Sequence, residues 1–261
     1  MKIFSGVGAP AGTLKIFTPI QAIAVVAPQS VLTGMQFRVT LVNSQTSFSD
    51  EIIPLTPWET LAKIGVMTNG AYIKASEDNS IPCRFSIPLH PTRSLNLNDN
   101  LYIQIEVQGG TFGNTEWSMY GVERAGLAPL GQYMKYNKMS LGVGEQIKRY
   151  LVGANTDAFL PVTGALDIVR VNYTQNGQVQ SCVLGVNEMI ALGLVESDAL
   201  NWSFDTECEG FVASPGLGIA SDGICHIMLR GTDIQADSIE VSRGDGYQSV
   251  GYEFFTFEMR N

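Results

Sequence analysis

The sequence predicts an all-β protein made of two tandem eight-stranded jelly rolls, each with one short inserted helix. Three observations lead to this prediction: segments that alternate between apolar and polar residues, turn-forming clusters between these segments, and a pattern that recurs in the second half of the chain. Eight antiparallel strands in two sheets form a jelly roll, and strands that follow one another directly exclude a parallel winding through helices.

The alternation is clearest in residues 35–41, 83–89 and 101–107, where every second residue is apolar. A period of two with one apolar face is typical of a strand in a two-layer sheet. Polar clusters at 96–100 and 176–177 are typical turn sequences. We therefore expect strands over the three alternating segments, with tight turns between strands.

A short helix is expected where residues 56–65 read TPWETLAKIG. Thr56 can cap this helix, Pro57 suits the first helical position, and Glu59 completes a capping box. Gly65 is placed to end the helix after a few turns, because glycine readily adopts the left-handed conformation that closes a helix.

The second half of the chain repeats this pattern. Its helix is expected in the stretch GVNEMIALGL, with Asn187 as the cap and Gly193 as the end. Four matches follow the same order in both halves, and their offsets drift only by loop-sized amounts, which indicates an internal duplication. The matched segments are 37–41 with 169–173, 59–62 with 188–191, 87–89 with 227–229, and 103–107 with 255–259.

The duplication predicts three parts of the chain. The first jelly roll is expected over residues 1–125 and the second over residues 156–261. Residues 126–155 are expected to form a connection, because they contain few long alternating runs, and a short helix is expected there over residues 145–151. The centre of this connection is expected to pack along the junction of the two jelly rolls.

Composition limits the range of functions. Charged residues make up 16% of the 261 residues, and the formal net charge is −9. A nucleic-acid-binding protein needs a basic surface, so no nucleic-acid partner is expected. A thinly charged chain is typical of a protein that covers much of its surface in an assembly. No run approaches the roughly 18 apolar residues of a membrane-spanning helix.

No catalytic motif withstands inspection, so the chain is not expected to be an enzyme. The glycine-rich stretch 6–13 lacks the lysine and the spacing of a phosphate loop. The two histidines, His90 and His226, are not accompanied by a nucleophile elbow of the form G-x-S-x-G. The tripeptide Arg243-Gly244-Asp245, which integrins recognise, is interpreted as an ordinary turn between strands.

Three acids at alternate positions, Asp205, Glu207 and Glu209, are the candidate metal ligands. On a strand they would share one face, and their repulsion would raise a pKa as in glycosidases. In a loop, their hard oxygens could bind Ca²⁺. Solvated loop acids are the third interpretation. No other cofactor is expected, because the four cysteines are widely spaced and lack the clustered ligands of a zinc site.

The repeated strand pattern, the helix openings at 56–59 and 187–188, and the length of the chain resemble a family of viral proteins. The chain is similar to the double-jelly-roll major capsid proteins of tailless, icosahedral, membrane-containing double-stranded DNA viruses, the corticovirus and tectivirus type. The resemblance covers most of the chain, and the family has no diagnostic residue motif.

This resemblance implies a structural protein of a bacteriophage virion. Three chains would form a homotrimer with a pseudo-six-fold outline, and such trimers would tile an icosahedral capsid over an internal viral membrane. Other capsid or vertex proteins would be partners, and the protein would be made in the host cytoplasm. Some relatives bind structural metal ions, so the resemblance is compatible with a Ca²⁺ site at Asp205, Glu207 and Glu209.

Aromatic residues are the candidate anchors of contacts between chains, since obligate interfaces are large and apolar. The candidates are Trp117, Tyr120, Tyr133 and Tyr136, and packing within the chain is the other interpretation of each. The alternative function is a carbohydrate-binding β-sandwich module or a viral spike or receptor-binding protein. Such a protein would present exposed rings to sugars, and Trp58, Trp117 and Trp202 are the tryptophans available for this.

Overall fold

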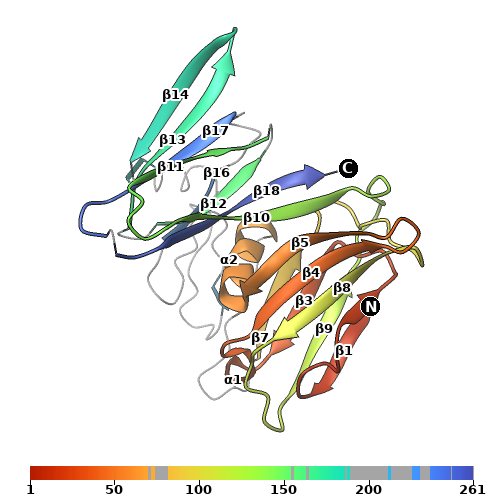
Figure 1. The fold of residues 1–261 in the computed structure, drawn as a ribbon. Coiled ribbons are helices and arrows are strands. Elements are labelled where there is room, and N and C mark those ends of the chain that lie inside the picture. The colour runs from red at the N-terminus through yellow and green to blue at the C-terminus, as the bar shows by residue number, and fades with distance from the viewer. Residues whose placement is uncertain are drawn as a thin grey trace. The chain divides into compact units, whose positions relative to one another are not determined.

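A computed structural model of the chain describes most of its residues. The described ranges are 1–69, 72–73, 82–153, 156–162, 165–185, 187–188, 211–212, 225–229, 236–247 and 249–260. Their strands form four sheets (Figure 1). None of the described helices is long and apolar enough to cross a membrane.

The chain divides into two compact units. The first unit comprises Met1–Lys135, Ser203–Ala213 and Met259–Asn261, and the second comprises Tyr136–Trp202 and Ser214–Glu258. Each unit has two sheets of its own, apart from short strand ends at the boundary.

The first unit contains a six-stranded and a four-stranded sheet. In spatial order, the six-stranded sheet consists of β1 (Lys2–Val7), β9 (Glu116–Val122), β3 (Ala22–Ala27), β7 (Cys83–Pro88), β6 (Tyr72–Ile73) and β15 (Phe211–Val212). The four-stranded sheet consists of β2 (Leu14–Ile16), β8 (Leu101–Gln108), β4 (Gln36–Asn43) and β5 (Phe48–Pro57). Two helices, α1 (Gln29–Leu32) and α2 (Trp58–Asn69), lie in the connections.

The path of the chain through this unit is that of a jelly roll. From β1 to β4, each successive strand lies in the other sheet, β4 and β5 form a hairpin, and β7, β8 and β9 alternate between the sheets again. Apart from the two-residue strands β6 and β15, which extend the six-stranded sheet beyond β7, eight strands form two sheets with the orders β1-β9-β3-β7 and β2-β8-β4-β5. This is the arrangement of two interlocked Greek keys.

The second unit repeats this arrangement with the next strands of the chain. One sheet consists of β10 (Tyr133–Leu141), β18 (Tyr252–Arg260), β12 (Asp157–Val162) and β16 (Cys225–Leu229). The other consists of β11 (Ile147–Leu151), β17 (Ser238–Arg243), β13 (Leu166–Gln175) and β14 (Gln178–Gly185). The orders β10-β18-β12-β16 and β11-β17-β13-β14 reproduce those of the first unit strand for strand. The prediction of two tandem eight-stranded jelly rolls is therefore confirmed.

The strand order also tests the internal alignment of the sequence. The first match pairs β4 with β13, which occupy the same place in their units and contain residues 37–41 and 169–173. The third match pairs the equivalent strands β7 and β16, at residues 87–89 and 227–229. The fourth match was wrong, because it paired β8 with β18, whereas the counterpart of β8 is β17. Alternating strands share a small alphabet of residues, so an apolar alternation by itself does not distinguish two neighbouring strands.

The first predicted helix exists, but its end was predicted wrongly. α2 runs from Trp58 to Asn69, so Gly65 lies inside it. The hydroxyl of Thr56 donates to the Pro54 carbonyl at 2.6 Å, and the Trp58 N–H donates to the carbonyl of Met35 at 3.0 Å. A main-chain carbonyl from another segment therefore satisfies the N–H that begins the helix.

The other two predicted helices have different outcomes. Asn187 and Glu188 are helical, and the rest of that segment, including Gly193, lies outside the described residues. The helix expected over residues 145–151 was wrong, because Ile147–Leu151 forms the strand β11. β11 pairs along its whole length with β17, and Tyr150 packs edge-on against Phe254 with ring centroids 5.1 Å apart. This pairing outweighs the local preference of the segment.

Each unit has its own buried core. In the first unit, Phe85 of β7 contacts both Phe37 of β4 and Trp58 of α2, with ring centroids 6.2 and 5.7 Å apart. The helix therefore covers the sandwich next to β7. In the second unit, buried apolar side chains from both sheets form one cluster, which includes Leu160, Val169, Val241 and Phe254.

Candidate functional site

The predicted metal ligands Asp205, Glu207 and Glu209 lie outside the described residues. Within the described ranges, no group of three or more His, Cys, Asp or Glu side chains could hold a metal ion. Ca²⁺ binding by the three acids stays a prediction.

Of the four candidate interface aromatics, Tyr120 is the one that offers its ring to solvent, with 38% of its surface exposed. Trp117 is buried, contacts Phe4 and Phe112, and donates from Nε1 to the Gly8 carbonyl at 2.8 Å. This arrangement ties the end of β1 to β9.

The two other candidates, Tyr133 and Tyr136, are also buried. The Tyr133 hydroxyl and the Lys135 ammonium both donate to the carboxylate of Asp50. Burial raises the pKa of Asp50, but the two hydrogen bonds and the charges of Lys135 and Arg260 together outweigh it, so its pKa lies below the usual value. Tyr136 packs edge-on against Phe257 at 4.7 Å, and burial raises its pKa. Both tyrosines therefore hold the chain itself together.

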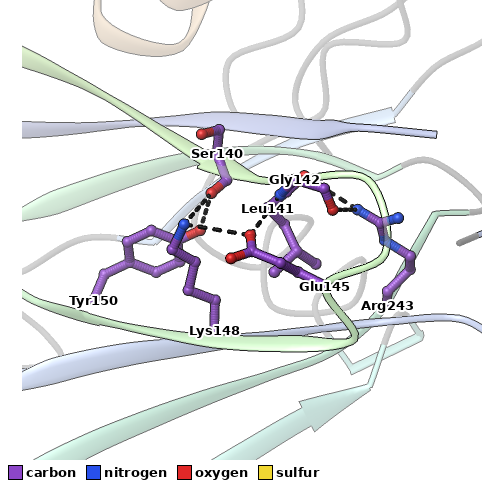
Figure 2. A network of polar contacts seen from close by, with 7 residues as sticks. All are labelled: Ser140, Leu141, Gly142, Glu145, Lys148, Tyr150 and Arg243. Carbon is purple, nitrogen blue, oxygen red and sulfur yellow. Dashed lines mark hydrogen bonds and ion pairs between the residues drawn. The ribbon is translucent and has the colours of Figure 1, made fainter. Parts of the chain in front are cut away.

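The turn between β10 and β11 is held by a buried arginine (Figure 2). The guanidinium of Arg243 donates to the carbonyls of Leu141 at 3.1 Å, Gly142 at 2.8 Å and Tyr247 at 3.0 Å. Its planar guanidinium donates here from two separate nitrogens, whereas the donors of a lysine all lie on one nitrogen. Because Arg243 is 3% exposed, the Arg-Gly-Asp tripeptide is not displayed as a whole, in agreement with its interpretation as a turn.

The other side of this turn is polar and more open. The Glu145 carboxylate accepts from the Gly142 N–H at 2.6 Å and from Lys148 at 3.3 Å, and the Tyr150 hydroxyl donates to the Ser140 carbonyl at 2.6 Å (Figure 2). The hydrogen bonds from Gly142 and Lys148 lower the pKa of Glu145. Burial, and then the Glu145 carboxylate, raises the pKa of Tyr150 to about 12. The network closes the turn and contains no arrangement typical of catalysis.

The two units carry the same cross-strand ion pair. Arg38 of β4 contacts Glu106 of β8 at 3.2 Å, and Arg170 of β13 contacts Glu240 of β17 at 3.1 Å. In each case the two residues are direct partners in the sheet register. The sequence contained a signal for this pair, since Arg38 and Arg170 occupy the same position in the matched segments.

A pocket of about 770 Å³ lies at one end of the first unit. The turn between β4 and β5 forms one wall, the loop before β8 forms another, and residues 130–133 complete it. All of its described lining residues are uncharged, and they include Asn43, Gln45, Asn98 and Asn100. Sequence reasoning missed this site, because its walls come from three segments that are far apart in the chain.

The comparisons with known proteins give distant likenesses in structure. No protein-family model and no curated protein sequence matches the chain. A chain in the cryo-EM structure of the Sputnik virophage is 7% identical with a TM-score of 0.34, over 99% of this chain and 84% of that one. The mavirus major capsid protein is 9% identical with a TM-score of 0.27, over 100% of this chain and 86% of that one. Both TM-scores lie below 0.5, so the assignment of the fold rests on the strand order itself.

Proposed function

We propose that the chain is a structural major capsid protein whose copies form trimers that tile the shell of an icosahedral virion. The observation that carries this proposal is the repetition of one eight-stranded order in both units of the chain. Three chains with two similar units each supply six similar units, which suits a tile of pseudo-hexagonal outline. One gene product can then cover a curved shell, and the two units can diverge at their contacts.

The proposal includes the setting of the protein. The virion is the proposed location, after synthesis in the host cytoplasm, and a bacteriophage of the corticovirus or tectivirus type with an internal membrane is the proposed source. Other capsid or vertex proteins and the viral membrane are the proposed partners, in addition to further copies of the chain. The acidic net charge of −9 supports a role without nucleic-acid binding.

We also propose that the protein is not an enzyme. One described histidine supports this: Nδ1 of His90 accepts the N–H groups of Thr92 and Arg93 at 3.2 and 3.0 Å, and the side chain is 4% exposed. A nitrogen that already accepts two hydrogen bonds is poorly placed to act as a general base.

Light scattering on the purified chain tests the proposed trimer. We expect a mass near three times the 28.3 kDa of one chain at micromolar concentration. Negative-stain images of the same sample should show hexagonal tiles. A monomer at that concentration would contradict the proposal.

The candidate anchor Tyr120 can be tested in the same measurement. Tyr120→Glu places a charge at a side chain that we expect to be buried between chains, so the trimer fraction should fall. Tyr247→Glu is the matched control, because Tyr247 is also an exposed tyrosine, at 44%. An equal trimer fraction in wild type and Tyr120→Glu would remove Tyr120 from the interface while leaving the trimer proposal in place.

The described tryptophans do not support the alternative of a carbohydrate-binding module, because both are buried. Trp58 and Trp117 are 3% and 2% exposed, and Trp202 lies outside the described ranges. Buried rings cannot stack on a sugar from solution. Assembly is therefore the better supported of the two functions.

A further inference from the structure

The pocket of the first unit is held in shape by two turns of the same kind. The Asn43 side-chain oxygen accepts the N–H groups of Gln45 and Thr46 at 3.0 and 3.3 Å. The Asn98 side-chain oxygen accepts the N–H groups of Asn100 and Leu101 at 2.9 and 3.0 Å. Such asparagine turns fix the local backbone, so both walls are ordered without a ligand.

The two walls are also joined to each other. The Asn100 carbonyl accepts both the N–H of Ser44 at 2.8 Å and the Ser44 hydroxyl at 3.3 Å. At the third side of the pocket, Tyr133 is anchored by its hydrogen bond to Asp50. A ligand that enters this pocket therefore meets preformed walls, which lowers the entropic cost of binding.

The chemistry of the lining selects a neutral and polar ligand. The side-chain oxygens of Asn43 and Asn98 each accept two hydrogen bonds already, so these side chains have their amide N–H groups left to offer. Gln45 and Asn100 add amides that can both donate and accept. An anion or a cation would find no opposite charge among the described lining residues.

Apolar side chains complete the lining. Phe48 and Leu130 border the pocket with 47% and 67% of their surfaces exposed, and Leu41 and Leu101 are buried beneath it. A ligand with hydroxyl groups around its edge and C–H groups on one face matches both kinds of surface. Monosaccharides and disaccharides have this character, and aromatic rings commonly pack against their C–H faces.

We propose that this pocket binds a neutral carbohydrate. The proposal goes beyond the role in assembly and does not depend on it. An extended peptide fits less well, because peptides bind to edges and grooves through free main-chain groups. The main-chain N–H groups of residues 45, 46, 100 and 101 are already used by the two asparagine turns.

Saturation-transfer NMR with the methyl glycosides of glucose, galactose, mannose and N-acetylglucosamine tests the proposal on the full chain. We expect at least one of these probes to bind at millimolar concentration. Phe48→Ala should weaken its binding at least tenfold, and so should Gln45→Ala. Phe17→Ala is the matched control, because Phe17 is a similarly exposed phenylalanine, at 40%, that does not line the pocket.

The outcomes separate clearly. Both pocket residues are exposed, Phe48 with 47% of its surface, so both variants should still unfold cooperatively, and loss of binding by a folded variant then reports on the pocket. If none of the four glycosides gives a saturation-transfer signal with the wild-type protein, the proposal is overturned. Binding that survives both pocket substitutions would also overturn it. So would binding of an acetylated dipeptide amide in place of the glycosides, which would assign the pocket to a peptide.

Discussion

A Cβ atom added at Gly65 would lie 2.2 Å from the main-chain carbonyl oxygen of Ser86. α2 therefore lies this close to β7 because residue 65 has no side chain. Glycine inside a helix costs up to about 1 kcal/mol relative to alanine. The close contact between helix and sheet, and not the end of the helix, explains why glycine occupies this position.

Gly65→Ala should destabilise the protein by about 1–3 kcal/mol, since the added methyl group must displace main-chain atoms in a packed region. Chemical denaturation followed by circular dichroism measures the change. Gly153→Ala is the matched control, because a Cβ at Gly153 would have its nearest contact at 3.6 Å, with Thr156. A gain of stability in Gly65→Ala would show that helix propensity outweighs this contact, contrary to our expectation.

The equivalent ion pairs of the two units should each make a similar and small contribution to the free energy of unfolding. Double-mutant cycles with alanine at Arg38 and Glu106, and at Arg170 and Glu240, should each give a coupling of about 0.2–1 kcal/mol, as is usual for partly exposed pairs. Arg38→Ala should lower the free energy of unfolding more than Arg170→Ala does, because Arg38 also contacts Glu51 at 3.0 Å. Both couplings should decrease at high salt. A coupling that is insensitive to salt would contradict an ionic origin.

His90 should make stability depend on pH just below neutrality. Burial lowers the pKa of His90 and the nearby Arg93 lowers it further, although a hydrogen bond to Gln132 opposes them. Above pH 6.5, the pKa of the ring in the unfolded chain, the ring is neutral in both the folded and the unfolded state. Its full contribution to stability is present there. As the pH falls below 6.5, the unfolded chain takes up the proton first, so stability is lost until the folded pKa is reached.

His90→Asn is the informative variant for this prediction. An asparagine side chain can accept the same two N–H groups in a turn like those at Asn43 and Asn98, but it does not titrate. We expect a thermal midpoint near that of wild type at neutral pH and a smaller decrease below pH 6.5. His226 is present in both proteins, so its titration cancels in the comparison. Identical pH profiles would refute the assignment to His90.

Arg243→Lys should destabilise the second unit by about 1–3 kcal/mol. A lysine keeps the charge but cannot reach the three carbonyls that the guanidinium satisfies, and a buried carbonyl without a donor costs about this much. Thermal unfolding measures the loss. Arg149→Lys is the control, because Arg149 is an exposed arginine of the same unit that makes one hydrogen bond, to Ser238 at 2.8 Å. Equal effects of the two substitutions would show that the carbonyl contacts are unimportant.

The sequence by itself determined several strands and the duplication. Alternation with a period of two is a property of neighbouring residues, so β4, β7 and β8 were predicted close to their observed bounds. The repeated order of the patterns predicted two jelly rolls, because a copied sequence retains its local signals. The beginning of α2 was predicted within one residue for the same reason.

Tertiary structure alone decided which strands are neighbours and where a ligand could bind. β11 became a strand through its pairing with β17, and Gly65 is explained by a carbonyl of Ser86 in another strand. Two walls of the pocket are joined where the carbonyl of Asn100 accepts the N–H of Ser44, a residue far away in the chain. Such contacts depend on the path of the whole chain through two sheets, and no local pattern of residues encodes that path.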